Sequence, residues 1–312
     1  MGHDLATKAE LVKLARALDT TPERVAFATT LDHGEVRRLR EQVVGVLYDE
    51  HRAAFQRVAT ITRFLPTPLN VRIALRAFSP LLAARIAGEM PAERAAELAN
   101  RMPVDYLAEA CVHLDPRRAA PLLTRIEPNR VLAVVAELVN RGDFITLGRL
   151  LDAASEKIVG DVAATVPDDA LLRIGFYAES DSRLTRAVLV LPPERLRSVV
   201  HRAMTGPEDL RSAGLSLIGR LTDDALRGRL ANHAAELGFD AHTAMLHTAL
   251  SDGAVPELLT AVAAMDEPSR KRVLTLPALT ESGMLLRLHA AAPDHPLWST
   301  LTNHALVRRL LA

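Results

Sequence analysis

Residues 90–128 read MPAERAAELANRMPVDYLAEACVHLDPRRAAPLLTRIEP, and this stretch decides the fold class. An apolar residue recurs in it every twelve positions, and a proline follows each of these residues by one or two positions. The series begins upstream and consists of Phe78, Met90, Met102, Leu114 and Ile126. Twelve residues accommodate one helix of about nine residues, roughly 13 Å long, and a turn. Such a helix is too short to be stable alone in water, so the repeat predicts a stack of short helices.

The prolines are typical of first helical positions, where the missing N–H costs no hydrogen bond. Since each apolar residue directly precedes such a start, we expect Met90, Met102, Leu114 and Ile126 to be buried in the turns. Some helix starts also carry an arginine two residues after the proline, namely Arg24, Arg118, Arg130, Arg195 and Arg270. A cation there opposes the helix dipole. We therefore expect at least three of these arginines to contact a carbonyl or carboxylate of an adjacent helix.

Strand signals are nearly absent, and helix-forming residues dominate the whole chain. The predicted fold class is all-α, a superhelix of short stacked helices of the HEAT or armadillo type. Residues 1–65 are predicted to form N-terminal helices, including one long helix from Asp32 to about Arg63. Residues 66–312 are predicted to form the short-helix repeats.

The segments that start at Met90 and at Leu114 share an apolar residue, a proline one or two residues later, and then a charged residue, Ala-Ala, any residue and Leu. This pattern resembles the N-terminal cytoplasmic domain of MgtE-type magnesium channels and the related short-helix repeats of the flagellar switch protein FliG. The resemblance implies a fold and a role in interaction or regulation. It does not imply channel function, because no apolar run of about 20 residues follows that could span a membrane.

Composition narrows the function classes. The 312 residues carry 38 basic and 38 acidic side chains, so the formal net charge is zero and no nucleic-acid partner is expected. Nearly all basic residues are arginine, which is typical of GC-rich bacterial genes. A single cysteine, Cys111, and an N-terminus without an apolar signal core predict a reducing, cytoplasmic location.

Several side chains could carry chemistry, but each has a simpler structural explanation. Tyr48, Glu50 and His51 share one turn of the predicted long helix and form the one candidate polar site. His51 lies on the apolar stripe, and we interpret it as a core histidine rather than a metal ligand or general base. Cys111 lies on an apolar stripe as well and is interpreted as a buried, inert thiol.

Two further groups contain residue types that can bind metals. His233, His242 and His247 are interpreted as surface or helix-end histidines, because their spacings do not place two of them on one helix face. The acidic first turns at 168–169 and 223–224 could hold a hard cation only if two of them faced each other. Helix-dipole stabilisation accounts for them without a metal, and no cofactor is predicted.

The sequence favours a non-enzymatic helical-repeat scaffold or regulatory protein that binds another protein. The alternative is a carrier or sensor of an apolar, lipid-like ligand in a helical cavity. The third hypothesis is an enzyme of unrecognised type. The sequence does not indicate the oligomeric state. The stretch from Phe64 to Met90 is where we expect an apolar ligand site or a membrane-surface contact. Its candidate contact residues are Leu65, Leu69, Ile73, Phe78, Leu82 and Ile86.

Overall fold

The computed structural model describes residues 5–49, 51–280 and 283–301, and helices are the only regular secondary structure in these ranges. The all-α prediction is therefore confirmed. None of the described helices has both the length and the apolarity needed to cross a bilayer.

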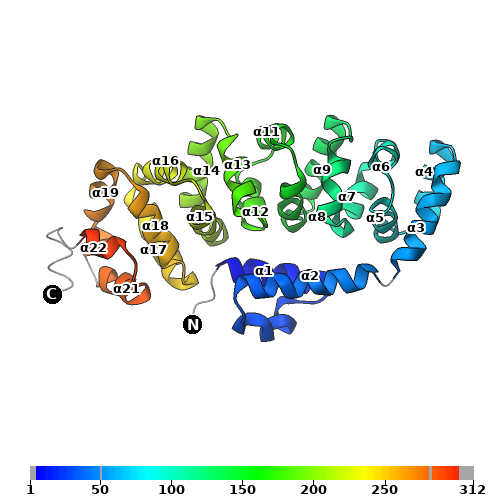
Figure 1. Ribbon diagram of the computed structural model, residues 1–312. Helices are drawn as coiled ribbons and strands as arrows, with labels where there is room; N and C mark the ends of the chain where they lie inside the picture. The colour runs from blue at the N-terminus through cyan, green and yellow to red at the C-terminus, as the bar shows by residue number, and fades with distance from the viewer. Residues whose placement is uncertain (1–4, 50, 281–282, 302–312) are drawn as a thin grey trace.

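The chain begins with a helical unit that lies alongside the later helices in Figure 1. This N-terminal unit comprises α1 (Leu5–Ala17), the 3-10 helix η1 (Pro22–Thr30) and α2 (His33–Asp49). It has an apolar cluster of its own, to which no later element contributes. The cluster consists of Leu11, Leu14, Ala15, Val25, Ala28 and Val36.

The helices that follow form a curved row, and the N-terminal unit lies along one side of it (Figure 1). The first part of the row comprises α3 (Arg52–Ile61), η2 (Thr62–Phe64), α4 (Thr67–Ala77), α5 (Pro80–Ala87), α6 (Ala92–Ala99), α7 (Val104–His113), α8 (Pro116–Leu123) and α9 (Pro128–Asn140). The middle comprises α10 (Phe144–Leu150), η3 (Leu151–Ala153), α11 (Glu156–Thr165), α12 (Asp168–Phe176), α13 (Asp181–Leu189), α14 (Pro193–Thr205) and α15 (Glu208–Arg220). The last part comprises α16 (Asp224–Ala235), α17 (Phe239–Asp252), α18 (Val255–Ala264), α19 (Glu267–Leu274), α20 (Pro277–Thr280), α21 (Met284–Ala291) and α22 (Leu297–Leu301).

Helices in the row pack mainly on the next but one along the chain. In the first part, α3 packs on α5, α5 on α7 and α7 on α9, while α4 packs on α6 and α6 on α8. The apolar core is correspondingly divided into successive clusters along the row. This is the arrangement expected when each short helix is stabilised by its neighbours rather than by one central core.

Local sequence explains where these helices begin. Ser79, Asp115 and Asp143 are N-caps whose side-chain oxygens accept a hydrogen bond from a backbone N–H in the first turn. Proline occupies one of the first two helical positions in several helices, as the sequence predicts.

The twelve-residue step corresponds to the spacing of the turns. Met102 and Leu114 are buried, whereas Met90 and Ile126 are partly buried, and all four lie between consecutive helices. Burial is thus confirmed for two of the four residues and is incomplete for the other two. The step returns later at Ala154, Val166 and Ala178, which also lie in turns between helices. Alanine is too common in this chain for that continuation to stand out in the sequence.

The prediction of one long helix from Asp32 to Arg63 is wrong. α2 ends at Asp49, and α3 begins at Arg52 with His51 as its N-cap, at φ −119° and ψ 12°. The two halves pack on different partners, since α2 packs on α1 and α3 packs on α5. Their apolar stripes match a single helix, but tertiary packing separates them.

Candidate functional site

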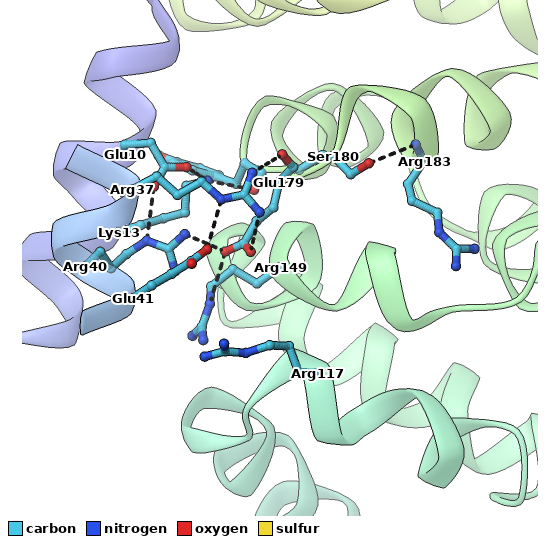
Figure 2. Close-up of polar contacts among 12 residues, drawn as sticks. Glu10, Lys13, Arg37, Arg40, Glu41, Arg117, Arg149, Glu179, Ser180 and Arg183 are labelled. Atoms are coloured by element: carbon cyan, nitrogen blue, oxygen red, sulfur yellow. Dashed lines mark hydrogen bonds and ion pairs between the residues drawn. The ribbon is translucent and has the colours of Figure 1, made fainter. Parts of the chain in front are cut away.

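A cluster of charged side chains joins the N-terminal unit to the middle of the row (Figure 2). We call it the charge cluster. Its members are Glu10 and Lys13 of α1, Arg37, Arg40 and Glu41 of α2, Arg149 of α10, and Glu179 in the turn after α12.

Glu179 is the centre of the cluster. Its carboxylate lies 3.0 Å from Nη2 of Arg40 and 3.7 Å from Nη2 of Arg37. Nε of Arg149 approaches the same carboxylate to 3.7 Å. The backbone oxygen of Glu179 also accepts a hydrogen bond of 2.8 Å from Nη1 of Arg37. One turn of the row therefore binds α2 through both its side chain and its backbone.

Glu10 is the second acidic centre. Its carboxylate accepts hydrogen bonds from Nζ of Lys13 and, at 3.0 Å, from Nε of Arg40. All three residues are at most 6% exposed, so these ion pairs are shielded from water. Burial alone disfavours the charged carboxylate, but Lys13 and Arg40 together outweigh it and lower the pKa of Glu10.

Asp152 lies beside the charge cluster, and its pKa is shifted in the opposite direction to that of Glu10. Burial, and then the negative charge of Glu179, raise the pKa of its carboxyl group. The pKa values of Glu10 and Asp152 shift in opposite directions because Lys13 and Arg40 both donate to the carboxylate of Glu10.

Two outer ion pairs extend the contact along the row. Arg16 of α1 donates to both carboxylate oxygens of Asp143, the N-cap of α10. Lys8 lies 2.9 Å from Asp252 at the end of α17. Because α10 belongs to the middle of the row and α17 to its last part, these pairs hold the N-terminal unit at two separate places along the row. This interface was missed by sequence reasoning, since its signal was limited to charged residues on otherwise apolar helix faces.

The predicted polar site is not assembled as expected. Glu50 lies outside the described residues, and only the backbone of Tyr48 is described. His51 is exposed at the junction of α2 and α3, with its ring centroid 6.5 Å from that of Phe55. Its interpretation as a core histidine is wrong, because the helix that would have buried it ends before it.

Other sequence candidates have protein partners. Asp168 lies 3.2 Å from Arg195, and Asp169 pairs with Arg202. Within the described ranges, no group of three or more His, Cys, Asp or Glu residues is placed to hold a metal ion. Burial, with a contribution from the charge of Asp143, raises the pKa of the Cys111 thiol to about 12, as expected for an inert thiol.

The arginines at helix starts divide into two groups. Arg118 donates to the carbonyl of Gly88 at 2.8 Å, Arg195 to that of Val166, and Arg270 to that of Met265 at 2.7 Å. These carbonyls belong to the ends of α5, α11 and α18. Arg24 and Arg130 make no such contact with the described residues. The expected three of five are therefore confirmed, and these three arginines join the start of one helix to the end of another.

The predicted apolar contact residues lie at the α4 end of the row, and the structure separates them by exposure. Leu69, Ile73 and Leu82 are exposed, Leu65 and Phe78 are half-buried, and Ile86 is buried in the core. Half of the large exposed apolar side chains of the described chain lie between residues 61 and 82. They are Ile61, Phe64, Leu69, Ile73, Leu75, Leu81 and Leu82, and Phe64 is 84% exposed. We call this surface the apolar end.

Two cavities lie among the helices. One, of about 320 Å³, lies among α3 to α8, and Ile61, Leu65, Ile73 and Phe78 are among the residues that line it. The other, of about 340 Å³, extends along the row, and its lining is apolar apart from a few residues such as Arg130 and His242. His242 lies near the start of α17, in keeping with a helix-end position, but it is buried rather than at the surface, and its Nδ1 lies 3.0 Å from the carbonyl oxygen of Gly238.

Comparison of the chain with protein-family models, curated proteins and solved structures finds no match. The resemblance to the MgtE and FliG helical domains is therefore supported only at the level of an all-α arrangement of many short helices.

Proposed function

We propose that this protein is a non-enzymatic helical-repeat interaction protein, which associates with a macromolecular partner through its apolar end. The observation that carries the proposal is the clustering of exposed apolar side chains at residues 61–82. Scattered exposed apolar residues are normal on a protein surface, but a concentration of them at one place is typical of an interaction site.

The position of this surface supports the same function. Repeat proteins need a terminal unit with a polar outer face to cover the last hydrophobic surface of the stack. The N-terminal unit is not in that position, because the charge cluster holds it along the side of the row (Figures 1 and 2). The row itself is a stack of interlocked helices, which suits a surface that must keep its shape on binding.

Cysteine accessibility tests this proposal without knowledge of the partner. Leu69→Cys places a thiol in the apolar end, and Leu189→Cys places one at a matched position in α13, since Leu69 and Leu189 are 44% and 46% exposed. The native Cys111 is partly buried and the pKa of its thiol is raised to about 12, so it should contribute little background. We expect maleimide to label Leu69→Cys much more slowly in intact native cells than in purified protein, and Leu189→Cys equally in both. Equal labelling of Leu69→Cys in both settings would remove the basis of the proposal.

A second function, carriage of an apolar ligand, is favoured by one observation. His242 is buried, lines the larger cavity, and its Nε2 has no hydrogen-bond partner among the described residues. A hydroxyl or carboxyl group on an otherwise apolar ligand would provide that partner. Native mass spectrometry of the purified protein should then detect a bound small molecule that is lost in His242→Phe. Its absence from the wild-type protein would contradict this function.

A further inference from the structure

The outer face of α4 combines apolar and cationic side chains. Leu69, Arg72, Ile73 and Arg76 are all exposed, and their spacing of three, one and three residues places them on one face of the helix. The opposite face, with Asn70, is buried against the row. The helix therefore presents two arginines beside two apolar side chains to whatever lies outside the row.

Neighbouring elements extend this surface. Arg63 and Phe64 are exposed in η2 directly before α4, and Leu81 and Leu82 are exposed at the start of α5. Ile61 and Ile73 line the same cavity, so the end of α3 and the outer face of α4 border one region. The apolar end therefore draws on α3, η2, α4 and α5, and its α3 and α4 residues border a common cavity.

The charge of this region is strongly one-sided. Residues 51–88 contain six arginines and no aspartate or glutamate, although the whole chain has a formal net charge of zero. The guanidinium groups of Arg57, Arg63, Arg72 and Arg76 are exposed and make no ion pair or hydrogen bond with the described residues. The chain is therefore neutral as a whole, but this part of its surface is cationic.

We propose that the apolar end binds the surface of an anionic lipid bilayer. This proposal rests on the proposed function and names the partner of the same surface. Apolar side chains would enter the boundary between headgroups and acyl chains, while the flanking arginines would remain at the level of the lipid phosphates. Each cationic side chain near such a membrane strengthens binding about fivefold.

Shape favours a bilayer over other partners. α4 lies at the outer end of the row, where it suits a flat partner (Figure 1). A second copy of the chain would place arginines against arginines across a symmetric contact, which repels. Nucleic acid would use the arginines but would leave Leu69 and Ile73 without a counterpart, and Phe64 is the one exposed aromatic side chain available there for stacking on a base.

Phe64→Trp provides a direct reporter of insertion. The native Trp298 is buried, and its Nε1 donates to the carbonyl of Ala292 at 2.7 Å, so its emission should stay constant. With vesicles of phosphatidylcholine and phosphatidylglycerol, the emission of Phe64→Trp should shift to shorter wavelength. Vesicles of phosphatidylcholine alone should cause little or no shift.

Charge variants then test the role of the arginines. Arg72→Gln with Arg76→Gln should weaken binding to the anionic vesicles about 30-fold, at about fivefold per charge. The matched control is Arg186→Gln with Arg197→Gln, which removes the same charge from exposed positions of α13 and α14. Leu69→Ser with Ile73→Ser should also weaken binding, whereas Leu189→Ser with Val190→Ser should not. Circular dichroism confirms that each variant is folded.

The outcomes separate this proposal from the one on which it rests. A shift that is independent of lipid charge, or an equal loss in the control pair, would overturn the bilayer proposal. If vesicles do not bind but Leu69→Cys is still protected in cells, the interaction function stands and its partner is an acidic protein or a nucleic acid. If Leu69→Cys is unprotected and vesicles do not bind, both proposals fail.

Discussion

The charge cluster and the apolar end are both rich in arginine, yet their arginines are in opposite situations. Arg40 is 4% exposed and lies against the carboxylates of Glu10 and Glu179. Arg72 and Arg76 are exposed and have no acidic partner within the described chain. What an arginine does here depends on whether folding brings an acid to it from elsewhere in the sequence. Paired arginines fix the molecule's own architecture, and unpaired ones are available to a partner.

The same contrast applies to apolar side chains. The N-terminal unit buries most of its apolar residues in a small cluster of its own, and it meets the row through ion pairs and through Leu5, which is buried in the apolar core of the last part of the row. The apolar end is left exposed by the helices that the structure describes. Substitutions in the two regions should therefore affect different properties, stability in the first and binding in the second.

The largest effect is expected from Glu179→Gln. This change leaves Arg40 buried with half of its charge compensation removed, and loss of one partner of a buried ion pair costs about 3 kcal/mol or more. Chemical denaturation should show this loss of unfolding free energy. Limited proteolysis should show faster cleavage of the N-terminal unit.

The control for this change is Glu194→Gln on α14, where the glutamate is exposed. It should alter the free energy of unfolding by less than about 0.5 kcal/mol. Equal effects of the two substitutions would mean that the charge cluster does not hold the N-terminal unit to the row.

Acid should weaken the charge cluster through Glu10. Its pKa in the folded protein is below the ordinary value of 4.5, so its ionised form stabilises the fold. That contribution is complete above pH 4.5 and is lost as the pH falls through the lowered pKa. The difference in unfolding free energy between wild type and Glu10→Gln should therefore be largest above pH 4.5 and shrink below it.

The raised pKa of Asp152 acts in the other direction, because protonation of this buried carboxyl at low pH relieves a destabilising charge. Repeating the measurement in an Asp152→Asn background removes that opposing contribution. A difference between wild type and Glu10→Gln that stays constant from pH 7 to pH 3 would contradict the assignment.

An intermediate effect is expected where an arginine joins two helix ends. Arg118→Met removes the hydrogen bond to Gly88 and the ion pair with Glu89, whose side chain is only 5% exposed. Charge-assisted hydrogen bonds of this kind contribute about 2 kcal/mol, and thermal denaturation should detect the loss. Arg24→Met makes the matched change at an exposed helix start and should have almost no effect. A large effect of Arg24→Met would mean that the sequence position alone, not the contact, stabilises the helix.

The smallest effect on stability is expected at the apolar end. Arg72→Gln with Arg76→Gln should change the free energy of unfolding by less than about 0.5 kcal/mol, because both side chains are exposed and unpaired. Differential scanning calorimetry measures this directly. A clear loss of stability would show that these arginines belong to the internal architecture, as Arg40 does, and would remove the contrast between the two regions.

Much of the fold could be predicted because its signals are local. A proline at a helix start and an apolar residue just before it act within one or two turns of helix. Met90, Met102, Leu114 and Ile126 therefore indicate the turns correctly, although only two of them are fully buried. The arginines at helix starts were partly predictable for the same reason, since the dipole of each helix is a local property.

The failures concern contacts between distant parts of the chain. No residue type near His51 predicts the end of a helix. The helix ends there because α2 and α3 pack on different elements. Arg37 and Glu179 are 142 positions apart, so no pattern in the sequence indicates that they meet. The apolar stretch after Phe64 was predicted, but its exposure could not be, because that depends on which helix covers the end of the row.

The sequence by itself determined that this chain is helical, that its helices are short, and where most of them begin. Each of those properties depends on interactions within a few residues. Only the tertiary structure decided that the N-terminal unit lies along the side of the row, where its charges are paired, rather than over the end at α4. That choice depends on the sum of packing and ion pairing between surfaces far apart in the chain, and it separates the buried arginines from the exposed ones.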